Sequence, residues 1–215
     1  MKSSILVIGL GRFGTAAARE LEHLGHEVLA VDLSEAAVND IAPEVTHAVQ
    51  LDASDETALR SVGAGEFDYA IVAISGSTEA SIFATMALKN LGVGHVIAKA
   101  ATALHGAILD RVGADRVVYP EREMGIRAAH SLAIPDVIDY LDVAPRFGIV
   151  KVAPPASFVG RSLRDLDLPG RLQVSPIALR RGSDVTFNPH RDTVIAAGDE
   201  LILMGSDERL ERIGS

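Results

Sequence analysis

The chain has 215 residues, 48% of them hydrophobic and 23% charged, and a formal net charge of −9; these values exclude global disorder and allow one large domain, or one ordinary domain with a small one. Without cysteine, disulfides, thiolate catalysis and sulfur-ligated metals are excluded. Before Arg146, ten Lys and Arg stand against twenty Asp and Glu, compared with ten against nine from there on, so the acidic first part repels nucleic-acid phosphates and we expect no nucleic-acid partner.

The first predicted strand runs into a turn with three glycines, Gly9, Gly11 and Gly14; a helix over 15–24 and a strand ending at Asp32 follow. In a dinucleotide-type fold the first glycine allows a tight turn, the second lets phosphate approach the backbone, and the third lets helix and strand pack closely. Asp32 can accept hydrogen bonds from both hydroxyls of a ribose. Because strand, turn, helix and acid follow within about 30 residues, nucleotide binding is favoured over a glycine turn that only packs.

Strands and helices continue to alternate up to residue 133. Ser34 can cap a short helix, a strand follows at 47–51, and Ser54 is expected to cap the next helix. Further strands are predicted at 69–74, 95–99 and 116–119, and further helices at 77–91, 102–112 and 121–133. Six strands separated by helices predict an α/β domain, a doubly wound, Rossmann-like parallel sheet in the order 3-2-1-4-5-6.

The pattern changes beyond residue 134, where Ile134-Pro135 and Ala144-Pro145 punctuate a predicted linker over 135–146. Short strands are then predicted at 148–152, 174–179, 184–187 and 200–204, with weak helices near 162–168 and 206–213. We therefore predict a nucleotide-binding domain over 1–134 and a second, smaller α+β domain over 147–215. The second domain is too small to hold a large core alone, so we expect it to dimerise.

A dinucleotide fold most often serves hydride transfer, which needs a proton donor and a substrate pocket. None of the tyrosines (Tyr69, Tyr119 and Tyr140) has a lysine four residues later, and the histidines are scattered. Nucleophile-elbow, Walker-type and zinc-helix motifs are absent as well. The sequence thus favours a nucleotide that regulates over one that reacts, and we predict no catalytic residue. A small NAD-dependent oxidoreductase is the main alternative, and a redox-sensing repressor, which would need a basic DNA-binding module, is the second.

Several segments together resemble the cytosolic Ktr and Trk subunits of bacterial potassium uptake, in which a regulator-of-potassium-conductance (RCK) N-domain precedes an RCK C-domain. These segments are Ile8-Gly-Leu-Gly-Arg-Phe-Gly14, His26-Glu-Val-Leu-Ala-Val-Asp32, 46–49, 71–74, 113–116 and Pro120-Glu-Arg-Glu-Met-Gly125. The resemblance spans the chain and is strongest over the first 130 residues. It implies a non-enzymatic regulator that forms a ring of dimers, usually an octamer, beneath a membrane channel protein. ATP then favours the active assembly and ADP the inactive one.

The resemblance also implies a nucleotide site. Its residues are Gly9, Gly11, Arg12, Phe13, Gly14, Asp32, Leu33, Asp52, Ala53, Ile74, Ser75 and Lys99. The glycines form the phosphate turn, Asp32 holds the ribose and Asp52 lies beside the adenosine. Arg12 would pair with a terminal phosphate, including that of a neighbouring subunit, and so distinguish ATP from ADP; a solvated arginine is the alternative. Lys99 would approach the phosphates from a strand end, or be a surface lysine.

Two further sites follow from the resemblance. Glu121 comes directly after Pro120, where the family's glutamate meets its symmetry mate at a dimer interface and helps to hold Ca²⁺ or Mg²⁺; Glu123 is its neighbour. In many relatives the C-domain binds cyclic di-AMP. Here Pro169 stands where we would expect an arginine, and Arg171 could substitute only in part. Cyclic di-AMP is therefore a doubtful partner, and dimerisation is the safer role of the C-domain.

We predict a cytosolic regulatory subunit of a potassium channel or transporter that senses ATP against ADP, with NAD or NADH as the alternative ligand. The carboxylate of Asp32 disfavours a 2′-phosphorylated cofactor such as NADPH. The segment 1–4 runs directly into the first strand, so we expect no cleavable signal. No apolar run approaches the roughly 20 residues that cross a bilayer, so we expect a soluble protein. The resemblance implies a cytoplasmic location at the inner face of the plasma membrane, through an integral-membrane partner.

Overall fold

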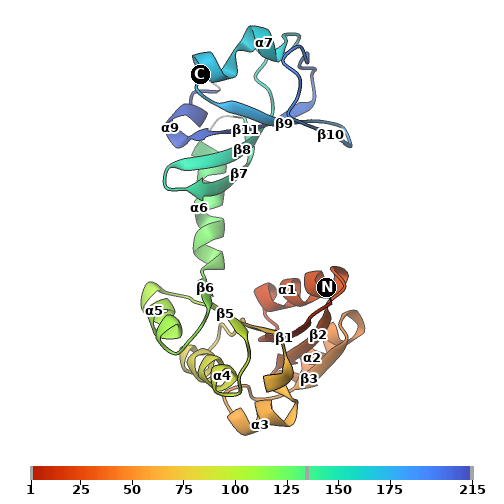
Figure 1. The fold of residues 1–215 in the computed structure, drawn as a ribbon, viewed down its shortest axis with the longest axis vertical. Coiled ribbons are helices and arrows are strands. Elements are labelled where there is room, and N and C mark those ends of the chain that lie inside the picture. Colours follow the sequence, from red (N-terminus) through yellow and green to blue (C-terminus); the bar gives the residue numbers. More distant parts are fainter. Residues whose placement is uncertain (1, 134–135, 214–215) are drawn as a thin grey trace. The chain divides into compact units, whose positions relative to one another are not determined.

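The protein is described by a computed structural model over residues 2–133 and 136–213. Two compact units divide the chain, Met1–Glu121 and Arg122–Ser215, and Figure 1 shows the elements of each. The division falls inside α6 (Pro120–Ala133), so one helix carries the chain out of unit 1 and into unit 2. Across the described ranges, no helix combines the length and the apolar character that a membrane span requires.

Unit 1 is built on a six-stranded parallel sheet in the order β3-β2-β1-β4-β5-β6, which confirms the predicted doubly wound, Rossmann-like fold. The strands are β1 (Ser4–Ile8), β2 (Glu27–Asp32), β3 (His47–Gln50), β4 (Tyr69–Val72), β5 (His95–Lys99) and β6 (Arg116–Val118). The helices are α1 (Arg12–His23), α2 (Glu35–Ile41), α3 (Glu56–Ser61), α4 (Thr78–Asn90) and α5 (Ala103–Arg111), with short 3₁₀ turns η1 (Ala42–Glu44) and η2 (Ala64–Glu66).

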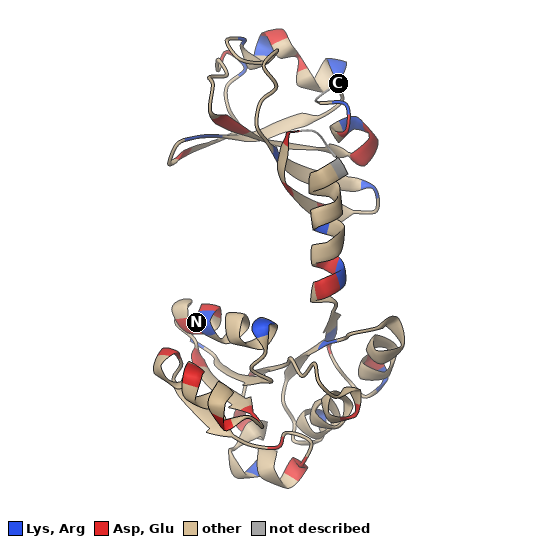
Figure 2. Ribbon diagram, turned by 180° about the vertical axis from the view of Figure 1, so that it is seen from behind, with Lys and Arg blue, Asp and Glu red and all other residues tan. Residues whose placement is uncertain are grey.

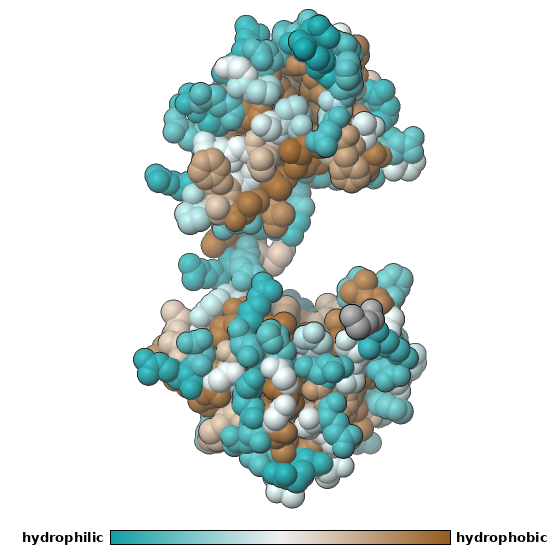
Figure 3. Space-filling view, viewed as in Figure 1, coloured by the Kyte–Doolittle hydropathy of each residue, from teal (hydrophilic) through white to brown (hydrophobic). Residues whose placement is uncertain are grey.

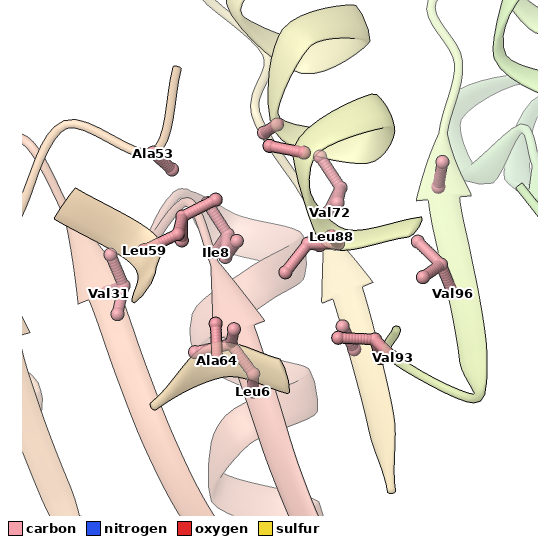
Figure 4. Close-up of a cluster of buried hydrophobic side chains, with 14 of the residues drawn as sticks. Leu6, Ile8, Val31, Ala53, Leu59, Ala64, Val72, Leu88, Val93 and Val96 are labelled. Atoms are coloured by element: carbon pink, nitrogen blue, oxygen red, sulfur yellow. The ribbon is translucent and has the colours of Figure 1, made fainter. Parts of the chain in front are cut away.

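The core of unit 1 lies on both faces of this sheet, because successive side chains of a strand point to opposite sides. Leu6 of β1 belongs to the same buried cluster as Leu59 of α3 and Leu88 of α4 (Figure 4). Its neighbour Val7 lies in a second cluster with Ala18 of α1. A fully buried leucine stabilises the fold by roughly 1.5–3 kcal/mol. Helices therefore pack on both faces of the sheet and hold in place the carboxyl ends of its strands.

The start of α3 differs from the prediction by one residue. Asp55, rather than Ser54, is the N-cap, and its carboxylate accepts a hydrogen bond from the backbone N–H of Thr57 at 2.8 Å. The hydroxyl of Ser54 instead donates to Oδ1 of Asp52 at 2.7 Å. Both residue types cap helices well, and the hydroxyl of Ser54 is already engaged, so the aspartate takes the capping position.

Unit 2 is built on an antiparallel sheet of five strands in the order β10-β9-β11-β8-β7. The strands are β7 (Val137–Ala144), β8 (Phe147–Val152), β9 (Ser175–Arg181), β10 (Asp184–Phe187) and β11 (Asp199–Ser206), and the short helices are α7 (Leu163–Leu166), α8 (Leu168–Arg171) and α9 (Asp207–Leu210). Val150 and Val152 of β8 are in register with Leu203 and Leu201 of β11, and all four are fully buried. The predicted α+β domain is confirmed.

Most of the segment predicted as a linker, 135–146, is a strand. β7 pairs antiparallel with β8, and Pro145 lies in the turn between them. The prediction was wrong here because Pro145 belongs to the tight turn of a hairpin and not to an irregular connection. Residues 134 and 135, where the predicted first domain meets the linker, lie outside the described residues. The boundary between units falls after Glu121, earlier than expected.

The later part of α6 is fixed to β7 within unit 2. Arg127 donates two hydrogen bonds to the carboxylate of Asp139, and the ring of His130 stacks on Tyr140 with the centroids 4.0 Å apart. The Tyr140 hydroxyl donates to Asp207 at 2.8 Å; burial, with this bond, raises the pKa of Tyr140. Since Tyr140 is only 2% exposed, these contacts join α6, β7 and α9 into one body.

His105, at the start of α5, is a buried titratable group with an incomplete set of hydrogen bonds. It is 4% exposed. Its Nδ1 accepts a bond from the backbone N–H of Ala101 at 3.3 Å, whereas Nε2 has no partner among the residues that the structure describes. Burial lowers the pKa of His105 from its ordinary value of 6.5. The folded protein therefore holds the neutral imidazole.

This arrangement predicts a loss of stability in acid. Below about pH 6.5 the unfolded chain binds a proton at His105 that the folded chain resists, so the free energy of unfolding falls as the pH drops. Urea unfolding at pH 7.5 and 5.0 should show a smaller pH dependence for His105→Asn than for the wild type. His23→Gln, at an exposed position of α1, is the matched control and should keep the wild-type dependence. Equal acid sensitivity of His105→Asn and the wild type would contradict this account.

Candidate functional site

A cavity of about 390 Å³ opens at the carboxyl ends of β1, β2 and β4. Its lining comprises Ile8, Gly9, Gly11, Asp32, Leu33, Leu51, Asp52, Ala53, Ala73, Ile74, Ser75, Gly76, Ser77 and Ala80. In an open α/β sheet, ligands bind outside the carboxyl ends of the strands where the strand order reverses. Here the order reverses between β1 and β4. The cavity therefore occupies the position at which this fold accommodates a ligand.

Two of the three motif glycines are required by the chain itself. Gly9 has φ +93°, and a Cβ there would lie 2.8 Å from the backbone N of Ile74. A Cβ on Gly14 would lie 1.8 Å from the carbonyl oxygen of Gly9. A Cβ on Gly11, by contrast, would meet no atom within 4 Å. Gly11 therefore borders open space in the cavity. A ligand phosphate can approach its backbone closely because no side chain stands in the way.

The two kinds of glycine predict different outcomes for alanine. Gly14→Ala should lower the free energy of unfolding by about 3 kcal/mol, the upper end of the usual cost of overpacking, because the carbonyl of Gly9 cannot move without distorting the turn. Gly11→Ala should leave stability nearly unchanged. Thermal unfolding of both variants in the absence of nucleotide measures the difference. Equal melting temperatures for the two variants would show that the close contact at Gly14 is not limiting.

The helix α1 presents its N-terminus to this cavity. Gly11 is the N-cap with extended backbone, and Arg12 is the first helical residue. The first turn contains no acidic side chain. Unpaired N–H groups and the helix dipole make such a terminus favourable for an anion. One end of the cavity is thus suited to negative charge.

Asp32, at the end of β2, holds the glycine turn in place. Its Oδ2 accepts a hydrogen bond from the backbone N–H of Leu10 at 2.6 Å, and its Oδ1 accepts one from Ser34 at 2.7 Å. The sequence predicted a ribose ligand here but not these two bonds. Each carboxylate oxygen can accept more than one hydrogen bond, so the same side chain can also receive ribose hydroxyls from the cavity that it lines.

Asp52, beyond the end of β3, lines the same cavity. Its Oδ1 accepts bonds from the hydroxyl and the backbone N–H of Ser54 at 2.7 and 2.9 Å. The Ser54 hydroxyl, followed by that N–H, lowers the pKa of Asp52, so this carboxylate stays ionised at neutral pH. The lining thus combines two carboxylates, which accept hydrogen bonds from hydroxyl donors, with a helix N-terminus, which favours an anion.

Lys99, the last residue of β5, lies next to the cavity without lining it. Its Nζ donates to Oγ of Ser75, a lining residue, at 3.0 Å and forms an ion pair with Oε1 of Glu121 at 2.6 Å. The Lys99 side chain is 8% exposed, whereas that of Glu121 is 70% exposed. The bond from Lys99 lowers the pKa of Glu121, and Arg12 contributes at longer range. Figure 2 shows acidic and basic positions together in the first turn of α6.

The structure brings together eight of the residues predicted for the nucleotide. These are Gly9, Gly11, Asp32, Leu33, Asp52, Ala53, Ile74 and Ser75. Arg12, Phe13, Gly14 and Lys99 are not in the lining; Gly14 lies buried beneath the turn. For the predicted metal ligand Glu121, no group of three or more His, Cys, Asp or Glu suited to a metal occurs within 2–133 and 136–213. Its role in holding a divalent cation stays a prediction.

Sequence reasoning missed several lining positions around the end of β4. They are Ala73, Gly76, Ser77 and Ala80, together with Ile8 and Leu51. Ser77 was expected only as the start of a helix, and it does cap α4 by accepting from the N–H of Ala80 at 3.1 Å. The carboxyl end of a strand at the topological switch point was the available signal.

Comparison with known proteins agrees with this architecture. Residues 5–120 match the TrkA-N domain and residues 148–215 match the TrkA-C domain. The chain belongs to the TrkA-N/TrkA-C family. It is 38% identical over 212 residues to the Ktr system potassium uptake protein C of Bacillus subtilis (strain 168), covering 99% of this chain and 96% of that protein. Protein A of the same system and organism is 36% identical over 206 residues, with coverage of 96% and 93%. The predicted Ktr resemblance is confirmed.

Solved structures share the fold as well. The GsuK channel bound to NAD aligns with a TM-score of 0.68 at 20% identity over 98% of this chain, which spans only 38% of that longer chain. GsuK bound to ADP aligns with a TM-score of 0.55 at 21% identity over 63% of this chain and 36% of that one. At such identities the likeness establishes the fold alone. This TrkA-N/TrkA-C protein is thus homologous to potassium uptake proteins and shares its fold with a channel protein.

Proposed function

We propose that this protein is a regulatory subunit of a potassium channel or transporter that senses adenine nucleotides in the cavity of unit 1. One observation carries the proposal: the open backbone at Gly11 and the N-terminus of α1 lie in the same cavity as the carboxylates of Asp32 and Asp52. This combination suits a molecule that carries both phosphates and ribose hydroxyls. Homology to Ktr potassium uptake proteins supplies the process that the nucleotide would control.

The proposed ligands are ATP and ADP, with NAD or NADH as the alternative. All four present a free adenosine ribose to Asp32, so this residue does not separate them. The relative GsuK has been solved with NAD and with ADP, which supports both ligand classes. When bound, the nucleotide supplies a chain of phosphates whose length differs between ATP and ADP. We propose that Arg12, in the first turn of α1, binds the terminal phosphate of ATP, which ADP lacks.

A regulatory role also accords with the chemistry of the lining. The ionisable side chains among the lining residues are Asp32 and Asp52. Both are engaged with backbone or hydroxyl groups of the chain. Within the part of the chain that the structure describes, the lining contains no His, Lys or Tyr to donate the proton that hydride transfer to a carbonyl requires. We therefore infer that a bound nucleotide is a signal for this protein, and turnover of a nicotinamide cofactor would be the result expected of an oxidoreductase instead.

Self-association is part of the proposal, because unit 2 exposes apolar side chains. Leu141 and Val143 of β7 and Phe147 of β8 are each more than half exposed, and Figure 3 shows hydrophobic surface over these strands. Contiguous apolar surface of this kind marks an interaction site. We propose that copies of this chain dimerise and assemble into a ring, octameric in the resembling family, beneath an integral-membrane partner at the inner face of the membrane. Glu121 would then hold Mg²⁺ or Ca²⁺ between subunits.

Isothermal titration calorimetry with a panel of nucleotides tests the proposed function. ATP and ADP should bind with a stoichiometry of one per chain. NADPH should bind at least tenfold more weakly than NADH, because its 2′-phosphate meets the charge of Asp32. Absorbance assays with nicotinamide cofactors and common metabolites should show no turnover. The proposal fails if no adenine nucleotide binds or if the protein oxidises a metabolite.

The role of Arg12 gives a second, narrower prediction. Arg12→Ala should weaken ATP binding by about 1.5 kcal/mol or more, the scale of a charge-assisted hydrogen bond, and should leave ADP binding nearly intact. The ratio of the two dissociation constants would then shift roughly tenfold. Arg19→Ala removes another exposed arginine of α1, one that pairs with Glu44, and should leave the ratio unchanged. Equal losses for ATP and ADP would refute phosphate sensing by Arg12.

A further inference from the structure

Lys99 is a nearly buried cation whose charge is balanced by a residue of another element. Its side chain is 8% exposed, and its ammonium group contacts Ser75, which is neutral, and Glu121. Burying an ammonium group without a counter-charge is costly. Glu121 therefore supplies the negative charge that allows Lys99 to lie beneath the surface at the end of β5.

The same ammonium group lies one hydrogen bond away from the nucleotide cavity. Ser75, its 3.0 Å partner, lines that cavity together with Gly11. Arg12 adds positive charge close enough to act on Glu121. An anion that enters the Gly11 end of the cavity therefore competes with the carboxylate of Glu121 for the nearby positive charge, and Lys99 is the group that both would bind.

We propose that Glu121 is an internal competitor of the ligand phosphate, so that phosphate binding releases the first turn of α6 from β5. This inference rests on the proposed function and adds a mode of regulation to the same site. Without nucleotide, Lys99 holds Glu121 through the 2.6 Å ion pair. With nucleotide, a phosphate oxygen near Ser75 takes over Lys99, and the carboxylate of Glu121 returns to solvent or becomes available to another cation.

The position of Glu121 gives this exchange a consequence for the chain. Glu121 is the second residue of α6 and the last residue of unit 1, and the helix from Arg122 onward belongs to unit 2. Arg127 and His130 fix the later turns of α6 to β7. The ion pair with Lys99 thus joins the first turn of this helix to the end of β5. When Lys99 exchanges Glu121 for a phosphate, this ion pair between the first turn of α6 and β5 is lost.

A double-mutant cycle in calorimetry tests the competition, with the full chain in buffer containing EDTA so that divalent cations do not contribute. Glu121→Gln removes the competing charge and should tighten ADP and ATP binding about three- to tenfold, while adenosine, which lacks phosphate, binds unchanged. Lys99→Met should weaken ADP binding, and in this background Glu121→Gln should no longer tighten it. Glu121→Asp, which shortens the side chain, should act in the same direction as Glu121→Gln if the latter folds poorly.

Glu79→Gln is the matched control, because Glu79 is an exposed acid in the first turn of α4, next to the lining residue Ala80. It removes the same charge near the cavity and should change ADP affinity less than twofold. An unchanged or weaker ADP affinity in Glu121→Gln, an equal effect on adenosine, or a gain that persists with Lys99→Met would overturn this inference alone. Failure of the wild type to bind any adenine nucleotide would overturn the proposed function and the inference together.

Discussion

The close approach of Gly14 to the carbonyl oxygen of Gly9 is the constraint on which the rest of the site depends. No side chain fits between these backbones, so the start of α1 lies directly against the end of β1. That contact places the N-terminus of the helix, with its favourable potential for anions, beside the cavity. Asp32 fixes the same turn from the other side by accepting the N–H of Leu10. The turn is thus rigid before any ligand is present, and Gly11 faces open space.

A preformed turn has a thermodynamic consequence for sensing. Because the chain holds the turn without help, little ordering cost opposes binding at this end of the cavity. A ligand shifts a conformational equilibrium only by the difference in its affinity for the two states. The preformed turn would present the same backbone to ATP and to ADP, so under the proposed function discrimination between them would come from charged side chains near the turn. Arg12 and Lys99 are such side chains, since both lie near the turn and carry charge.

The fold of unit 1 could be predicted because local signals and global topology agree there. The strands are short, a side chain caps α2, α3, α4 and α5, and the glycine pattern fixes the first crossover. The linker prediction failed for a physical reason: β7 mixes Asp139 and Asp142 with apolar residues, and its pairing with β8 is a long-range property that local signals do not express. In the cavity, residues within the motif were predictable, whereas Ala73 and Ala80 required knowledge of how β4 lies beside β1.

The ion pair between Lys99 and Glu121 could not be predicted from the sequence. The sequence places Lys99 at the end of a strand and Glu121 after a proline, but nothing local joins them. The sheet register does so: Lys99 pairs with Val118 of β6, and α6 begins two residues later at Pro120. Proline fixes the start of a helix well because its missing N–H is not needed there, which sets Glu121 in the first turn beside the end of β5. A parallel register and one proline therefore bring a buried cation and an exposed carboxylate together, at the point where the chain leaves unit 1.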